Sequence, residues 1–121
     1  MTLVQAAELG RYGVTANAIA PAARTRMTEA VFADMMKKPD AGFDKMAPEN
    51  VSPLVAWLAS DEAGDVTGRV FEIAGGEIKL SDGWRATSEV TRDARWEATE
   101  LGPVVAKLLK EGLPPIKPYG T

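Results

Sequence analysis

Cysteine and histidine are both absent from the 121-residue sequence. Without cysteine the chain has no disulfide scaffold and no thiolate zinc site. Without histidine it also lacks the commonest metal ligand and the commonest general base. We therefore predict no metal site, and any acid-base chemistry has to use other side chains.

The sequence also lacks an excess of one charge and any long hydrophobic run. Its 14 Lys and Arg residues and 17 Asp and Glu residues give a net charge of -3, which predicts no nucleic-acid partner and no anionic membrane surface. No segment reaches the ~18–20 apolar residues that cross a bilayer. The amino terminus has no basic start before an apolar core, so we expect a cytoplasmic protein with no membrane partner.

Recognisable catalytic motifs are missing as well. Gly64 and Gly68 are not followed by the third glycine of a dinucleotide-binding loop, and a strand rather than a helix is expected after them. Tyr12 has Ala16 four residues later instead of lysine, so it forms no tyrosine-lysine proton-transfer pair at helical spacing. We therefore name no catalytic residue on this chain.

Two short apolar runs are typical of strands buried in a sheet. Residues 14–20 form the first run, and we expect Pro21 to end it. Residues 69–73 form the second run, which the Gly75-Gly76 turn follows. Inside the first run, Asn17 requires hydrogen-bond partners if it is buried, and a structural role is favoured over a ligand contact.

Apolar residues at helical spacing predict helices beside these strands. The segments expected are a helix end at 2–11, helices at 27–38, 48–59 and 97–111, a loop at 40–47, a short extended run at 78–80, and a proline-stiffened tail at 113–118. The helix over 27–38 is expected to start near Thr25 or Thr28, and the helix over 97–111 to begin at Gly102-Pro103.

This order of elements is the pattern of a parallel α/β sheet whose crossover helices cover its faces. Two parallel strands alone leave those faces open, so the sheet needs more strands than this sequence supplies. The predicted fold class is therefore α/β, with two main strands and about four helices, incomplete as a doubly wound domain.

Two longer segments resemble a known family. Residues 7–21 read AELGRYGVTANAIAP, and residues 57–76 read WLASDEAGDVTGRVFEIAGG. The first is similar to the sixth strand, with the segment before it, of the Rossmann sheet in short-chain dehydrogenases/reductases, and the second to their last helix and seventh strand. Residues 21–29, 48–58 and 71–73 resemble the branch with the (3R)-hydroxyacyl-CoA dehydrogenase unit of multifunctional β-oxidation enzymes and its bacterial relatives.

The resemblance covers residues 1–80 and implies the carboxyl-terminal half of a short-chain dehydrogenase-like Rossmann domain there. Residues 81–121 are expected to form a carboxyl-terminal extension with one helix and a proline-rich tail, and no function is assigned to them. The family's glycine-rich cofactor loop and its catalytic asparagine, serine, tyrosine and lysine all precede the matched region, so none of them is placed on this sequence.

The resemblance implies cofactor contacts in the loop after the first strand. In the family this loop covers the nicotinamide, and by position the contacts are Pro21, Ala22, Ala23 and Thr25, with Met27 at the border of the substrate pocket. A strand that ends in proline delivers free backbone groups to the carboxyl end of a sheet, where ligands bind in open α/β folds. Ala22 stands where many family members have glycine.

Two arginines of the same loop, Arg24 and Arg26, allow two interpretations. Guanidinium groups suit the phosphates of a cofactor or of an acyl-CoA. The alternative, that both are simply solvated arginines of the loop with no ligand, is equally compatible with the sequence.

Two functional hypotheses follow. In the first, the chain is the carboxyl-terminal portion of an oxidoreductase that uses NAD or NADP, possesses no activity alone, and in complete form transfers hydride between the nicotinamide and a hydroxyl or carbonyl carbon, with 3-hydroxyacyl-CoA as one substrate type. In the second, it is a non-catalytic interaction module that completes or binds a related subunit. Both hypotheses allow a homo-oligomer or association with a related subunit or fragment.

Overall fold

In the computed structural model, residues 1–83 and 85–115 are described. The chain divides into two compact units, Met1–Asp82 and Gly83–Thr121, and each is described by itself. Within the expected proline-stiffened tail, residues 113–115 have no regular structure and residues 116–118 lie outside the described residues.

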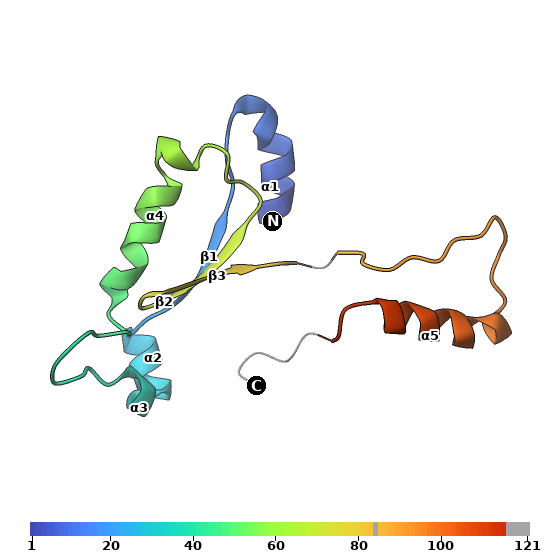
Figure 1. The fold of residues 1–121 in the computed structure, drawn as a ribbon. Coiled ribbons are helices and arrows are strands. Elements are labelled where there is room, and N and C mark those ends of the chain that lie inside the picture. Colours follow the sequence, from blue (N-terminus) through green and yellow to red (C-terminus); the bar gives the residue numbers. More distant parts are fainter. Residues whose placement is uncertain (84, 116–121) are drawn as a thin grey trace. The chain divides into compact units, whose positions relative to one another are not determined.

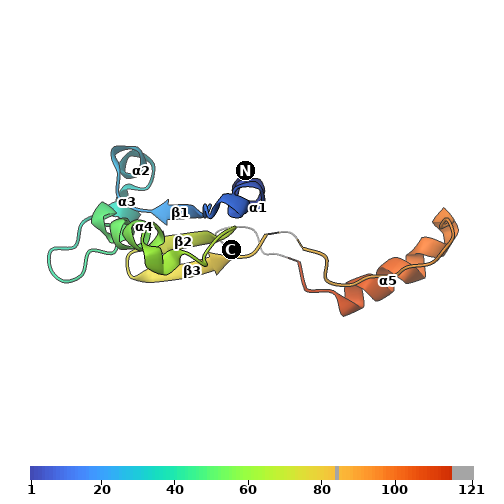
Figure 2. The ribbon, with the colours of Figure 1, turned by 90° about the horizontal axis from the view of Figure 1, so that it is seen from above.

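A three-stranded sheet organises the first unit (Figure 1). Its strands are β1 (Ala18–Ala22), β2 (Val70–Ala74) and β3 (Glu77–Ser81), in the order β1-β2-β3. β1 and β2 run parallel, whereas β3 turns back and pairs antiparallel with β2. Figure 2 shows the three strands from above, side by side in that order. The parallel pair confirms the expected α/β class, and β3 adds a third strand where only a short extended run was expected.

Pro21 lies inside β1 and does not end it, so that expectation was wrong. The strand begins at Ala18 and continues through Pro21 to Ala22. Ala18 donates its N–H toward β2, to the carbonyl of Arg69, at 2.9 Å. Because successive residues of a strand face alternate sides, the nitrogen of Pro21 faces away from β2. Proline therefore costs this ladder no hydrogen bond, and a strand tolerates it in such a position.

The strand register gives the sheet one apolar face and one mixed face, as the two-residue period of a strand requires. The apolar face carries the rows Ile19, Phe71, Leu80 and Pro21, Ile73, Ile78. The mixed face carries the rows Ala18, Val70, Ser81, then Ala20, Glu72, Lys79, then Ala22, Ala74, Glu77. On the mixed face, the Ser81 hydroxyl donates to the Glu72 carboxylate at 2.6 Å.

Two helices, α1 (Thr2–Leu9) and α4 (Ser52–Leu58), flank the strands on either side in the view of Figure 1. α4 follows a 3₁₀ turn at Pro48–Val51, which bears out the helix expected over 48–59. An open hollow of about 300 Å³ shows that α4 lies over the apolar face; it is lined by Thr15, Asn17, Ile19, Val55, Leu58 and Ala59. The buried hydrophobic side chains of the described residues are Met36, Leu54, Ala63 and Ile73.

The helix expected over residues 27–38 is broken in two. α2 spans Arg26–Val31 and α3 spans Ala33–Met36, and Phe32 between them has φ -125° and ψ 45°, outside the helical region. No glycine or proline marks this break. Val31 is β-branched and Phe32 is aromatic, and both types lose side-chain freedom in a helix, so the sequence supports a continuous helix only weakly there.

Asn17 ties the start of β1 to the segment that leads into β2. Its Nδ2 donates to the carbonyl of Val66 at 2.7 Å, and its Oδ1 accepts the backbone N–H of Arg69 at 3.1 Å. Beside it, the backbone N–H of Ala16 donates to the Thr67 hydroxyl at 3.0 Å. Both polar atoms of the Asn17 side chain have protein partners, which favours the structural role over a ligand contact.

The second unit contains the helix α5 (Leu101–Glu111), which follows a 3₁₀ turn at Ala98–Glu100. The helical segment therefore begins before Gly102-Pro103, where we expected its start. The reason is a cap at the start of the turn: the Glu100 carboxylate accepts the backbone N–H of Glu97 at 3.0 Å, and the N–H of Glu100 donates to the carbonyl of Glu97 at 3.0 Å.

An arginine organises the segment before α5. Arg92 lies over the Trp96 ring at 4.0 Å from its centroid and forms an ion pair with Glu100 at 2.9 Å. The hydrogen bond from Arg92 lowers the pKa of the Glu100 carboxyl.

Among the residues described in this unit no hydrophobic side chain is buried. No helix in the described part of the chain is both long and apolar enough to cross a membrane.

Gly75 is the residue at which β2 turns into β3, and no other residue type fits there without strain. It has φ +59°, and a Cβ at this position would lie 2.9 Å from the carbonyl oxygen of Lys45. Gly76, the next residue, is exposed, and a Cβ there would meet only Phe43 Cε1 at 3.9 Å. The turn is therefore sensitive at one of its two glycines.

We expect Gly75→Ala to lower the free energy of unfolding by about 1–3 kcal/mol, because it combines a left-handed backbone with a clash against backbone atoms. Chemical denaturation of the chain measures the loss. Gly76→Ala is the matched control and is expected to change the free energy of unfolding by less than about 0.5 kcal/mol. Equal losses in the two variants would show that the approach of Lys45 to Gly75 is unimportant.

Candidate functional site

The carboxyl ends of β1 and β2 lie at the same edge of the sheet because the two strands are parallel. The loop after β1 (residues 23–25) and the Gly75-Gly76 turn after β2 therefore meet at this edge. Residues 43–47 reach the same place: Arg24 donates its backbone N–H to the carbonyl of Met46 at 2.7 Å, and the backbone of Lys45 abuts Gly75. Ligands of open α/β sheets bind at such an edge.

The four predicted cofactor contacts are consecutive or nearly so at this edge. Pro21 and Ala22 are the last two residues of β1, and Ala23 and Thr25 follow at once. Pro21 and Thr25 are exposed, whereas Ala22 and Ala23 are half-buried. The alternation of the strand turns the Pro21 carbonyl away from β2. In the described part of the chain, the backbone N–H of Ala23 has no hydrogen-bond partner.

Two threonines fix the backbone of this loop by capping α2. The Thr25 hydroxyl accepts the backbone N–H of Thr28 at 3.2 Å, and the Thr28 hydroxyl accepts the N–H of Thr25 at 2.7 Å. The Thr28 hydroxyl also donates to the carbonyl of Ala23 at 3.0 Å. Thr28 was not among the predicted site residues; the sequence named it only as an alternative start of the helix, since the usual capping signal has Glu or Gln at this position.

The two loop arginines have different surroundings. Arg24 forms an ion pair with Asp44, and the two side chains are only 14% and 17% exposed. The guanidinium also donates to the carbonyl of Met36 at 3.2 Å. This setting favours a structural role for Arg24 over a phosphate contact. Arg26 is exposed on the first turn of α2, and both interpretations remain open for it.

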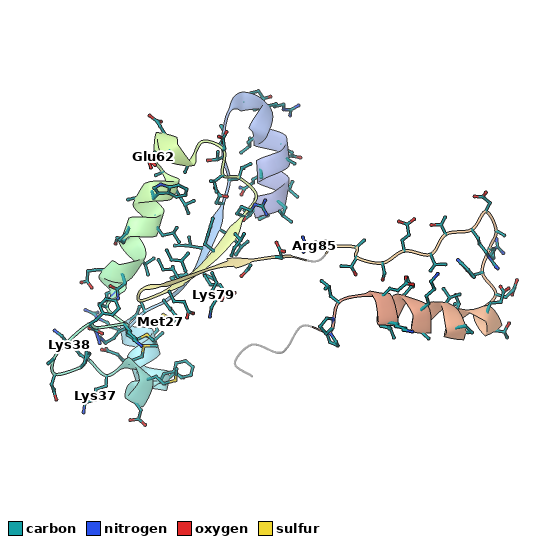
Figure 3. All side chains as sticks on the ribbon, in the orientation of Figure 1. Met27, Lys37, Lys38, Glu62, Lys79 and Arg85 are labelled. Atoms are coloured by element: carbon teal, nitrogen blue, oxygen red, sulfur yellow. The ribbon has the colours of Figure 1, made fainter. Side chains whose placement is uncertain are left out.

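Residues 26–46 form an excursion between β1 and α4 that contains α2, α3 and the loop after them. Met27 is 81% exposed on α2, and Val31 and Met35 add exposed apolar surface to the same excursion. Figure 3 shows Met27 together with Lys37 and Lys38, which follow α3, at this end of the first unit. Methionine suits a surface that adapts to an apolar ligand. The place of Met27 at a substrate pocket stays a prediction.

Two hollows adjoin the loop that contains Phe43. An open hollow of about 510 Å³ is lined by Phe43, Lys45, Met46, Ala74, Gly76 and Glu77. A second hollow of about 250 Å³ is lined by Met35, Lys37, Pro39, Phe43, Asp44, Lys45 and Met46. Within residues 1–83 and 85–115, no group of three or more acidic side chains is close enough to hold a metal ion.

Comparison with known proteins accounts for this arrangement. The sequence profile of the family described as enoyl-(acyl carrier protein) reductase matches residues 1–77. A crystal structure of a short chain dehydrogenase from Mycobacterium avium is similar with a TM-score of 0.73 and 51% identity, over 99% of this chain and 36% of that one. The chain belongs to the short-chain dehydrogenase/reductase family.

Curated relatives narrow the branch. The hydroxyacyl-CoA dehydrogenase ChsB1 of Mycobacterium tuberculosis is 39% identical over 102 residues, which cover 84% of this chain and 32% of that protein. The (3R)-3-hydroxyacyl-CoA dehydrogenase of Mus musculus is 34% identical over 87 residues, 63% of this chain and 31% of that protein. The chain is therefore a short-chain dehydrogenase/reductase of the hydroxyacyl-CoA dehydrogenase branch, and it spans about a third of the length of these relatives.

The segment after β3 is shared with relatives of this family. A match of 102 residues to ChsB1 extends past residue 80 wherever in the chain it starts. The Mycobacterium avium structure likewise covers 99% of the chain. At least part of the segment after the sheet, to which sequence reasoning assigned no function, is thus shared with ChsB1, and nearly all of it with the Mycobacterium avium structure.

We expect Thr28→Val to lower the free energy of unfolding by about 1 kcal/mol, because the change leaves the carbonyl of Ala23 and the N–H of Thr25 without their partner. Denaturant unfolding gives the free energy, and hydrogen exchange of α2 shows where the loss falls. Thr28→Ser keeps the hydroxyl and is expected to retain most of the stability. If the serine variant loses as much as the valine variant, the capping hydrogen bonds are not the cause.

Proposed function

We propose that this chain supplies the nicotinamide-facing part of an NAD(P)-dependent oxidoreductase of the 3-hydroxyacyl-CoA type. The observation that carries the proposal is the loop after β1 at the carboxyl edge of β1 and β2, with the Ala23 N–H unpaired within the described residues, in a chain whose relatives are hydroxyacyl-CoA dehydrogenases. In this proposal residues 1–80 belong to the Rossmann domain, and residues 81–121 form an extension of it.

The residues of the loop fit a nicotinamide carboxamide, which both donates and accepts hydrogen bonds. The Ala23 N–H is an available donor, and the Pro21 carbonyl, directed away from β2, is an acceptor. The exposed Thr25 hydroxyl is held by Thr28 and can turn its hydrogen toward a ligand. When bound, the nicotinamide would accept or supply the hydride. This chain's own residues would bind and orient the ring.

We place the acid-base chemistry outside this chain. The family resemblance implies a tyrosine and a lysine as the acid-base pair, and both precede the matched region. In the complete enzyme, that tyrosine would exchange a proton with the substrate oxygen, and the lysine would lower its pKa. The choice between NAD and NADP, the acyl chain preferred and a cytoplasmic location stay predictions.

A joined protein tests the proposal. The residues of ChsB1 that precede its matched segment are fused to Met1 of this chain, and NAD(P)H absorbance is followed with a 3-hydroxyacyl-CoA substrate. We expect turnover by the joined protein and none by the 121-residue chain alone, because the chain lacks the acid-base pair. Turnover by the chain alone would overturn the division of roles. A folded joined protein that turns over no nucleotide would overturn the oxidoreductase proposal.

We further propose that the chain associates with itself or with a related subunit or fragment. Within the described residues, β1 pairs only on its β2 side and β3 only on its β2 side, and Ile78 and Leu80 on β3 are 57% and 56% exposed. Unpaired strand edges beside apolar side chains favour association.

Multi-angle light scattering of the purified chain tests this association. We expect a mass above that of one chain, because the open strand edges and the apolar side chains beside them find partners. Leu80→Lys is expected to shift the chain toward monomer, since it places a charge on the exposed apolar face. A monodisperse monomer at all concentrations would contradict the proposal and would also weigh against the interaction-module hypothesis.

A further inference from the structure

Arg24 lies between two predicted cofactor contacts in the sequence, but its side chain is directed to a different place. Its guanidinium meets the Asp44 carboxylate through both terminal nitrogens, with Nη1 to Oδ1 at 3.3 Å and a closer contact between Nη2 and Oδ2. Such a two-pronged contact fixes direction as well as distance. The loop that would hold the nicotinamide is thereby tied to a residue 20 positions later in the chain.

The same arginine holds two further points of the excursion. Nη1 donates to the carbonyl of Met36, the last residue of α3, at 3.2 Å. The backbone N–H of Arg24 donates to the carbonyl of Met46 at 2.7 Å. Asp44 in turn accepts the N–H of Met46 at 3.2 Å, and its own carbonyl accepts from Asn50 Nδ2 at 2.9 Å. Arg24 and Asp44 together therefore contact both ends of the segment from Met36 to Met46, through their side chains and through the Arg24 backbone.

Burial makes this pair decisive for the position of the excursion. Both side chains are largely removed from water, so loss of either partner would leave a charge without compensation. The other acidic group near the guanidinium, Glu29, lies 3.8 Å from Nε and is 54% exposed, which makes it a weak substitute. The sheet does not depend on the pair, because the β1–β2 ladder and the Asn17 bonds hold the strands independently.

We propose that Arg24 and Asp44 are positioning residues for the cofactor loop. Their ion pair holds the excursion (residues 26–46) against the carboxyl end of β1 and so sets the backbone of Ala23 and Thr25 that faces the nicotinamide. The inference rests on the proposed function for the identity of the ligand. The part of the inference that says the ion pair holds the excursion in place does not depend on the proposed function.

Two variants and two matched controls test the proposal. Arg24→Met and Asp44→Asn each remove one charge of the pair. Lys38→Met removes an exposed cation of the excursion, and Asp40→Asn removes an exposed carboxylate of the same segment. Hydrogen exchange of all four variants is measured by mass spectrometry in the 121-residue chain and again in the joined protein, and the joined protein also gives KM and kcat for the nucleotide.

We expect about tenfold faster exchange in residues 26–46 for the two pair variants, with the rates in α4 and β2 unchanged. In the joined protein we expect the KM for the nucleotide to rise about tenfold with little change in kcat, because a displaced loop binds the ring less well while the reacting groups lie elsewhere. Both controls are expected to behave like the wild-type protein.

Other outcomes would overturn the inference. Unchanged exchange in the excursion would show that the pair does not hold it. Faster exchange throughout the chain would show a general structural role instead of local positioning. Local loosening with an unchanged KM would show that the excursion does not set the cofactor loop. A joined protein that is inactive with both residues intact would contradict the proposed function, and the exchange rates would then decide the positioning role alone.

Discussion

The parallel pairing of β1 with β2 is the constraint on which the rest of the first unit depends. Parallel strands require a crossover, and here the crossover holds the excursion, α4 and the segment that Asn17 clamps. The pairing also brings the ends of both strands to one edge, so the loop after β1 and the Gly75-Gly76 turn become neighbours. Antiparallel pairing would have separated them to opposite ends of the sheet.

Polar contacts hold the backbone at that edge in position, because few apolar groups are buried there. Of the excursion's several apolar side chains, Met36 is buried, whereas Met27, Val31 and Met35 are exposed. An excursion with so little buried surface gains little from the hydrophobic effect. Directional bonds replace it: the Arg24–Asp44 pair holds the loop after α3, and the Thr25–Thr28 cap holds the start of α2. Such bonds specify position more sharply than an apolar contact does.

The sequence was most informative where one local signal decided the structure. Thr25 was one of two predicted starts of α2 and is its N-cap, and the glycine pair at 75–76 marked the turn after β2. Pro21 misled because proline is usually a terminator, and its effect here depends on which side of the strand its nitrogen faces. That depends on a partner strand about fifty residues away in the sequence, which local pattern does not contain.

Long-range pairing explains the other differences too. β3 forms a strand because it pairs with the free edge of β2, and the short extended run at 78–80 did not by itself indicate that partner. The role of Arg24 depended on Asp44, a residue in a segment expected only to be a loop. By contrast, the break at Phe32 has no counterpart in long-range pairing. The break reflects the weak helix propensity of Val31 and Phe32, which a prediction from the spacing of apolar residues does not take into account.

The uncovered apolar surface of the first unit bears on what the chain joins. α1 exposes Leu3 and Val4, and β3 exposes Ile78 and Leu80, so apolar side chains lie open on helices and strands alike. A stable protein covers such surface with another part of itself or with another chain. In the function proposed above, the rest of a dehydrogenase would cover the β1 edge, because the relatives are about three times longer and share the matched segment. In the association proposed above, the β3 side would form the subunit contact, because Ile78 and Leu80 are exposed on the last strand of the sheet.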